Sequence, residues 1–189
     1  MKKAFVTLFL LFAFIANAQT DCQITTTTAK DGSEIKSTSE SLMYENVFGS
    51  TSNFIFFSLT KSNDIPILNF QLLTKSNDFL KIMGINKASR IYLQLMNGKI
   101  ITLISITEDN CSNLVYDEGD KKNIRVLTGT FLFTKGSLEE LEVSPIAFMR
   151  VKYGSETLDY PVSKQIQSEI MKAKYYPENY FINNLKCIK

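Results

Sequence analysis

The chain contains no histidine and no tryptophan among its 189 residues. Serine triads, Cys-His pairs and the commonest zinc and haem sites all use an imidazole side chain. Enzymes and metal sites that depend on histidine are therefore excluded. The other features of the sequence predict where the protein is located and how it folds, but they single out neither a reaction nor a partner.

Glycine and cysteine are also scarce, with 8 Gly and 3 Cys. The sequence holds no glycine-rich motif of the kind that surrounds phosphate groups. Zinc held by cysteine alone needs four thiolates in close pairs, and iron-sulfur clusters need a similar grouping. We therefore predict no cofactor, no metal ligand and no catalytic residue.

One uncharged run stands out near the start of the chain, and it is short. It covers the 12 residues from Ala4 to Ile15, after Lys2 and Lys3 and before Ala16-Asn17-Ala18. A positive start, an apolar run and a small-x-small site are typical of a secretory signal peptide. A membrane-spanning helix needs about 20 apolar residues. We predict a signal peptide over residues 1–18, cleaved after Ala18, with no transmembrane span in the mature chain.

The mature chain has no excess of either charge. The whole chain carries 21 Lys and Arg against 19 Asp and Glu, and cleavage removes Lys2 and Lys3, which leaves 19 of each sign. A neutral chain has no overall field that attracts a polyanion, so nucleic acid is not an expected partner. Gln19, Thr20 and Asp21 precede Cys22, whereas small apolar residues usually precede a lipid-modified cysteine. We expect export to the periplasm or the extracellular medium rather than lipoprotein anchoring at Cys22.

The three cysteines would meet an oxidising compartment after export. They allow three alternative single bridges, and three unpaired thiols are the remaining alternative. We favour Cys22 with Cys187, because that bridge joins the two ends of the domain. In the chain-entropy model, a bridge that closes so long a loop stabilises the fold by about 4 to 5 kcal/mol.

Short aromatic and β-branched runs, bounded by polar clusters, are typical of strands. They occur at residues 54–59, 67–73, 113–116, 124–133, 146–153 and 157–160. Ser137 and Glu140 have the spacing of a capping box, which predicts a short helix that Pro145 stops. After Pro161 the apolar period changes to that of helices, with one stripe from Val162 to Ala173 and another after Pro177.

These elements predict an α+β fold. We expect a mostly antiparallel sheet of about eight strands, strongly curled or in two layers, packed by two C-terminal helices. Residues 19–41 are rich in Thr and Ser and form either an N-terminal arm or an edge hairpin. Residues 42–189 form a single β-rich domain.

Asn97-Gly98 predicts a hairpin, because both residues tolerate the positive φ that a two-residue turn requires. That turn would pair Leu95 with Ile100. The resulting register would place Ile100 and Ile104 on the buried face with Ile91, Leu93 and Leu95. The other face, with Tyr92, Gln94, Lys99, Ile101 and Leu103, would be partly covered or partly wet.

The remaining candidates for function are acids and tyrosines. Glu139, Glu140, Glu156 and Asp159 could serve a carboxylate-only, glycosidase-like hydrolase, although a helix face and a strand account for them. The acidic residues at 117–120 could supply oxygens to calcium, but a polar turn between strands accounts for them. Tyr175 and Tyr176 precede Pro177, and a helix junction does not bury both rings. We therefore predict Tyr175 and Tyr176 as a binding surface for a protein, a peptide or a glycan.

The chain is similar to known proteins in several segments. These are the signal ending in Ala-Asn-Ala-Gln, the cysteine soon after it, residues 91–101 and residues 137–151. In these the chain resembles small exported proteins of unknown function from Bacteroidetes-type genomes. The resemblance implies no catalytic residue. The function we expect is an exported, non-catalytic domain that binds a protein, peptide or envelope component through a sheet face or edge. The alternatives are the carboxylate hydrolase and an inhibitor or immunity-like partner of a secreted protein.

Overall fold

The computed structural model describes residues 22–28 and 32–189 of the chain. The predicted signal peptide lies outside these residues. The strands in the first half are β1 (Ile24–Thr28), β2 (Glu34–Thr38), β3 (Ser41–Phe48), β4 (Thr51–Ser62), β5 (Ile65–Ser76), β6 (Gly84–Ile85) and β7 (Arg90–Leu95). The second half holds β8 (Ile100–Ser105), β9 (Asn110–Cys111), β10 (Asn113–Asp117), β11 (Lys122–Phe133), β12 (Ile146–Lys152), β13 (Thr157–Pro161), β14 (Ile166–Ser168) and β15 (Ala173–Tyr175). The helices are α1 (Ser137–Val143) and α2 (Tyr180–Asn184), with 3-10 turns η1 (Pro177–Asn179) and η2 (Leu185–Cys187) beside α2.

Most strands belong to one large antiparallel sheet. Its order is β1-β2-β4-β5-β11-β8-β7-β12-β13, with β3 also paired to β4 and β10 to β11, which makes 11 strands in the described residues. The mostly antiparallel α+β architecture is confirmed. The sheet is larger than the predicted eight strands and is not strongly curled, so these details of the prediction match only in part.

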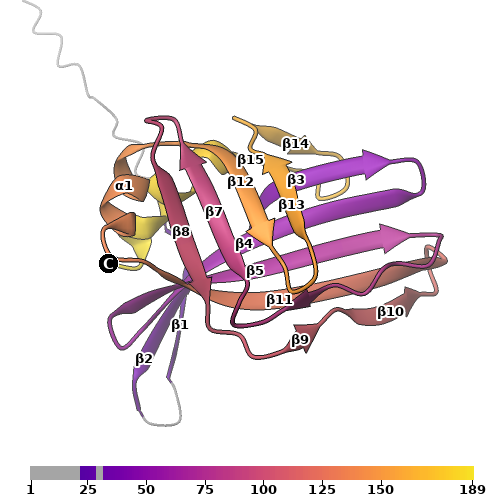
Figure 1. Cartoon of the computed structure of the whole chain (residues 1–189), viewed down its shortest axis with the longest axis horizontal. Coiled ribbons are helices and arrows are strands. Elements are labelled where there is room, and N and C mark those ends of the chain that lie inside the picture. Colours follow the sequence, from indigo (N-terminus) through magenta and orange to yellow (C-terminus); the bar gives the residue numbers. More distant parts are fainter. Residues whose placement is uncertain (1–21, 29–31) are drawn as a thin grey trace, which may run out of the picture.

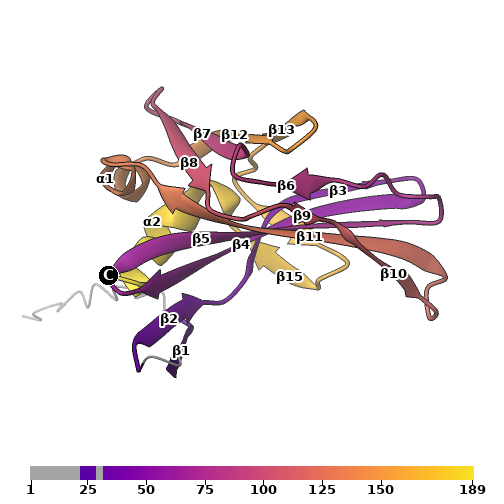
Figure 2. The same cartoon turned by 60° about the horizontal axis from the view of Figure 1, so that its bottom comes forward.

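Three long strands, β4, β5 and β11, form the centre of the sheet, and each has 12 residues. Strands β8, β7, β12 and β13 run across them (Figure 1). Figure 2 shows these four strands on one side of the long strands and the β1-β2 hairpin projecting on the other side. Residues 24–28 and 34–38 thus form an edge hairpin, one of the two structures considered for the N-terminal segment.

Alternation of side chains decides which face of the long strands is buried. Ile55, Phe57 and Leu59 of β4 are fully buried, while the side chains between them are only partly buried. The same period of two places Leu68, Phe70 and Leu72 of β5 in the core. Gly129 of β11 allows a close approach of β6, because an added Cβ would lie 2.7 Å from the Ile85 side chain, which would then have to shift.

Aromatic rings join the elements in the core. The ring of Phe57 lies 5.8 Å from that of Tyr180 in α2, and the ring of Phe70 lies 6.2 Å from that of Tyr153, just after β12. Each fully buried ring of this kind contributes about 2 to 3 kcal/mol of hydrophobic stabilisation. The core therefore lies between the long strands, the crossing strands and α2.

The hairpin β7-β8 has a different register from the predicted one. Gly98 donates its amide to the Leu95 carbonyl at 2.9 Å, and Leu95 donates to the Lys99 carbonyl at 2.9 Å. The loop therefore has three residues rather than two, and Gly98 takes the positive φ of 83° that ends such loops. The register shifts by one residue, so that Gln94 faces Ile100 and Leu93 faces Ile101.

This shift reverses the two faces of β8. Ile101 and Leu103 are buried beside Ile91 and Leu93, whereas Ile100 and Ile104 are exposed. A change of one residue in register moves every side chain of a strand to the other face. The prediction that Ile100 and Ile104 belong to the core is therefore wrong.

Of the two predicted C-terminal helices, the first, after Pro161, does not form. Residues 166–168 and 173–175 pair as two short antiparallel strands, β14 and β15, with Ile166 opposite Tyr175. Ser168 is buried, and its hydroxyl accepts the amide of Met171 at 3.0 Å, which holds the turn between the strands. Ile170, one of the predicted stripe residues, is exposed. The second stripe is confirmed as α2, where Tyr180 and Phe181 are buried.

Helix α1 forms where it was predicted, but not with the predicted cap. Its N-cap is Gly136, and no side chain caps its first turn. The Ser137 hydroxyl is bonded to the Thr134 hydroxyl at 2.7 Å, and Glu140 turns outward to Lys99. The helix ends at Val143, two positions before Pro145, as expected.

Candidate functional site

The outer face of β7, β8 and β12 is a candidate binding surface. Cross-strand pairing aligns Gln94 with Ile100 on one side and with Phe148 on the other. The next row aligns Tyr92 with Arg150. We call this surface the hairpin face, and its residues are Tyr92, Gln94, Ile100, Phe148 and Arg150. They line a shallow recess of about 430 Å³.

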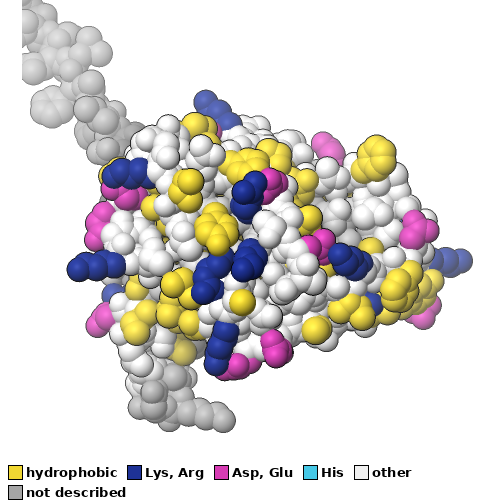
Figure 3. All heavy atoms as spheres, in the orientation of Figure 1, with side chains coloured by type: hydrophobic (Ala, Val, Ile, Leu, Met, Phe, Trp, Pro, Cys, Tyr) yellow, Lys and Arg dark blue, Asp and Glu magenta, His cyan; other side chains and the backbone are white. Residues whose placement is uncertain are grey.

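The hairpin face is unusual because its apolar side chains are open to solvent. Ile100 is 66% exposed, and Met96 and Ile104 beside it are 59% and 39% exposed. Figure 3 shows hydrophobic side chains gathered over β7 and β12, with Lys and Arg side chains next to them. A contiguous exposed apolar patch with a polar rim is a common mark of an interaction site.

Arg150 is held in place within the hairpin face by the strand beside it. Its guanidinium forms two hydrogen bonds to Asp159 of β13, Nε to Oδ1 at 2.5 Å and Nη2 to Oδ2 at 2.8 Å. These bonds hold the pKa of the Asp159 carboxyl below its usual range and raise the pKa of Arg150. Both side chains are about half exposed, so the pair positions the guanidinium more than it stabilises the fold.

Two further cations lie close to the hairpin face. Arg90, opposite Lys152 of β12, donates to the carbonyls of Lys87 at 2.6 Å and Ser89 at 2.7 Å, which fixes its guanidinium. Lys99 is bonded to Glu140 of α1, and this bond lowers the pKa of the Glu140 carboxyl. Apolar side chains and the fixed guanidiniums of Arg90 and Arg150 therefore lie on the same side of β7 and β12.

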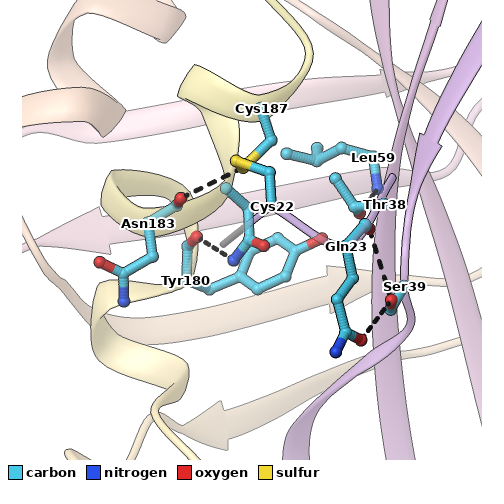
Figure 4. The surroundings of a disulfide bond; sticks show 9 residues. Cys22, Gln23, Thr38, Ser39, Leu59, Tyr180, Asn183 and Cys187 are labelled. Carbon is cyan, nitrogen blue, oxygen red and sulfur yellow. Dashed lines mark hydrogen bonds between the residues drawn. A yellow bond between two sulfur atoms is a disulfide. The ribbon is translucent and has the colours of Figure 1, made fainter. Parts of the chain in front are cut away.

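The predicted disulfide pair lies at the base of the N-terminal hairpin. The structure places Cys22 and Cys187 at bonding distance, with their Cα atoms 5.5 Å apart, across a sequence separation of 165 residues (Figure 4). Thr38 of β2 lies in the same region and accepts the Leu59 amide at 2.9 Å, which joins the hairpin to β4. The third cysteine, Cys111, is exposed and unpaired among the described residues.

Tyr175 and Tyr176, the predicted binding surface, do not form one surface with the hairpin face. Tyr175 ends β15 and lines a recess of about 280 Å³ together with Cys22 and Cys187. Tyr176 is half exposed and comes just before η1. The structure thus brings Tyr175 beside the disulfide, and a binding role for the two tyrosines stays a prediction.

Most of the acidic residues singled out in the sequence are paired with cations. Lys75 bonds to Asp117 at 2.9 Å and to Asp120 at 2.5 Å, and the Lys75 bond is the main cause that lowers the pKa of Asp117. Glu156 pairs with Lys81 at 2.9 Å. A general acid needs a raised pKa, whereas the carboxyls of Asp117, Glu140 and Asp159 have lowered ones. Asp117, Glu140 and Asp159 are therefore poorly suited to the role of general acid.

Two wider features of the described chain bear on the site. None of its helices is long and apolar enough to cross a membrane. Across residues 22–28 and 32–189, Cys, Asp and Glu side chains also form no group of three or more that could hold a metal ion.

Sequence reasoning missed most of the hairpin face. Phe148 and Arg150 lie in a correctly predicted strand, but alternation alone does not say which residues of a lone strand face solvent. A two-residue turn at Asn97-Gly98 predicts Ile100 in the core, whereas the three-residue loop leaves it exposed. The Asn97 side chain accepts the Lys99 amide at 3.0 Å in the longer loop, a bond that the sequence alone does not show.

Comparison with known proteins adds no relative. No protein-family model, no curated protein and no solved structure matches the chain. The functional argument therefore rests on the geometry of the hairpin face.

Proposed function

We propose that this protein is an exported, non-catalytic domain that binds a protein or peptide partner through the hairpin face. The observation that carries the proposal is the exposure of Ile100, Met96 and Ile104 beside the half-buried aromatic rings of Tyr92 and Phe148. Export is supported by the signal-like sequence at residues 1–18 and by the Cys22–Cys187 pair, which suits an oxidising compartment.

The chemistry of the hairpin face suits a macromolecular partner. Tyrosine and arginine are the side chains that most often dominate binding energy at protein interfaces, together with tryptophan. Tyr92 and Arg150 are direct neighbours across β7 and β12, and Asp159 already orders the guanidinium. The surface is shallow, so a partner would cover it rather than enter it. Arg90 and Lys152 at its rim favour a partner whose own rim is acidic.

The test compares capture by the native chain with capture by two charge variants. Ile100→Asp places a carboxylate at the centre of the hairpin face, and Val143→Asp makes a similar change at a 73% exposed position on α1, outside that face. The disulfide-bonded chains would be immobilised and exposed to envelope and culture-medium proteins of the producing cell. We expect one partner to be retained by the native chain and by Val143→Asp, and to bind Ile100→Asp at least about tenfold more weakly.

Two results would contradict the proposal. One is a partner that binds Ile100→Asp as tightly as the native chain, which would place the interface elsewhere. The other is no partner retained by any of the three chains.

A further inference from the structure

The outer face of the long strands carries a second recess, separate from the hairpin face. Its floor consists of two cross-strand rows, and each row takes one side chain from β4, one from β5 and one from β11. The rows are Ser58-Asn69-Thr130 and Phe56-Gln71-Thr128. We call this site the polar recess, and its volume is about 210 Å³.

The polar recess has walls on both sides. Glu40, between β2 and β3, lines one side, and Thr107 and Asn110, between β8 and β10, line the other. The Thr107 hydroxyl accepts the Thr130 amide at 2.7 Å, and the Asn110 side chain donates to the Thr128 carbonyl at 2.8 Å. The second wall is therefore bonded to the floor, so the site is preorganised.

The hydrogen-bonding groups of the polar recess are only partly used. Asn69 donates to Thr60 at 2.8 Å and to Ser58 at 3.3 Å, which leaves its carbonyl oxygen as an acceptor. The Gln71 amide, which can both donate and accept, has no partner within the described part of the chain. The Glu40 carboxylate likewise has no partner there. The site thus presents free donors and free acceptors close together.

Its charge and its aromatic ring restrict the ligand further. The described residues that line the recess include no Lys and no Arg, and Glu40 is their one charged side chain. Anionic ligands are disfavoured there. The half-buried ring of Phe56 lies in the same row as Gln71 and offers an apolar surface next to the amide. A ligand with many hydroxyls, one apolar face and no negative charge matches this set of groups.

The geometry points to the polar recess as a binding site for a neutral sugar ring of a glycan. The sugar hydroxyls would bond to Gln71, Asn69 and Glu40, each hydroxyl acting as donor, acceptor or both. The apolar face of the ring would pack on Phe56. This site is independent of the partner surface, because no residue of the hairpin face lines it.

The experiment is an NMR titration of the disulfide-bonded chain with four neutral methyl glycosides at millimolar concentration, those of glucose, galactose, mannose and N-acetylglucosamine. Methyl glucuronide serves as the charged probe. We expect at least one neutral glycoside to shift the Gln71 side-chain amide and the backbone amides of Asn69 and Thr130. The glucuronide should shift them less, because Glu40 repels it.

Matched variants separate the two surfaces. Gln71→Leu should bind the best neutral glycoside about tenfold more weakly, since it removes the free amide. Gln94→Leu, the same change on an exposed strand residue of the hairpin face, should bind it as the native chain does. The backbone spectrum away from the recess reports whether each variant is folded.

The sugar-binding inference is overturned if none of the four neutral glycosides shifts these amides, if the glucuronide shifts them equally, or if Gln71→Leu binds like Gln94→Leu. None of these results affects the proposed partner surface, which the Ile100→Asp comparison tests separately.

Discussion

Two faces of the same strands behave differently in this molecule. On β7 and β12, Ile91, Leu93, Met149 and Val151 are fully buried against the core. The residues between them, among them Tyr92, Phe148 and Arg150, form the hairpin face. The inner face is apolar because the core requires it. The outer face combines aromatic, aliphatic and cationic side chains that the core does not require, which is why we assign function to the outer face.

The largest expected effect comes from the bridge that holds the C-terminal segment over the inner face. Cys187→Ser should lower the free energy of unfolding by about 4 to 5 kcal/mol, because the opened chain regains the entropy of a very long loop. Guanidinium unfolding under non-reducing conditions measures this loss. Cys111→Ser, which removes the exposed unpaired cysteine, should leave stability unchanged, and partner binding through the hairpin face should survive in both variants. Equal stability of Cys187→Ser and the native chain would show that the bridge does not restrain the fold.

Truncation of one residue on each face sharpens the comparison. Leu93→Ala should destabilise the chain by about 3 kcal/mol, since Leu93 is fully buried and the cavity would lie in the core. Ile100→Ala should change stability by less than about 0.5 kcal/mol, because Ile100 is mostly exposed. Unfolding midpoints at equal slope provide the measurement. Similar losses for both variants would mean that β8 has the other register.

Replacing one tyrosine on each face by phenylalanine should give a smaller difference in the free energy of unfolding, and this difference should depend on pH. Tyr153 and Tyr160 share a buried hydroxyl-hydroxyl bond of 2.8 Å on the inner side. Tyr160→Phe leaves the Tyr153 hydroxyl unpaired and should cost about 1 to 2 kcal/mol. Tyr92→Phe, on the hairpin face, should cost less than about 0.5 kcal/mol.

Burial raises the pKa of Tyr160 to about 12. The unfolded value is about 10, so the contribution of the protonated phenol is full below pH of about 10 and is lost as the pH rises toward 12. Unfolding measured at neutral pH and at pH of about 11 should show a smaller alkaline loss for Tyr160→Phe than for Tyr92→Phe. The reverse order would place Tyr160 in water.

The smallest expected effect concerns the loop between β7 and β8, whose length determines which side chains of β8 are buried. Gly98 has a φ of 83°, where a Cβ is unfavourable, and nothing lies within 4 Å of an added Cβ. Gly98→Ala should therefore cost about 1 kcal/mol from the backbone alone. Met96→Ala in the same loop is the control and should be close to neutral. A neutral Gly98→Ala variant would contradict the left-handed backbone conformation of Gly98.

The sequence predicted most of the strands of the large sheet but not which of their faces is buried. Residues 54–59, 67–73 and 124–133 were predicted as strands because aromatic and β-branched runs between polar clusters favour few other structures. The hairpin at Asn97-Gly98 was also found. Its register was not, because two-residue and three-residue loops both accept Asn-Gly, and the choice between them depends on which isoleucines the core takes up.

The C-terminal error has a similar cause. Ile166 and Ile170 have helical spacing, but that spacing alone does not show that anything covers them. In the structure Ile166 pairs opposite Tyr175 in a two-stranded sheet, and Ile170 lies exposed in the turn region before Lys172, whose φ is 51°. Tertiary packing overrode a short periodic pattern. The hairpin face and the polar recess both depend on cross-strand neighbours, which only the fold reveals.

The most direct test of the account is the accessibility of two adjacent methyl groups, those of Ile100 and Ile101, to a soluble paramagnetic agent, measured by NMR on the free chain and on its complex with the captured partner. The account predicts strong relaxation of Ile100 in the free chain and protection of Ile100 in the complex, with Ile101 shielded throughout. Relaxation of Ile101 in place of Ile100, or an Ile100 signal that the partner leaves unchanged, would contradict it.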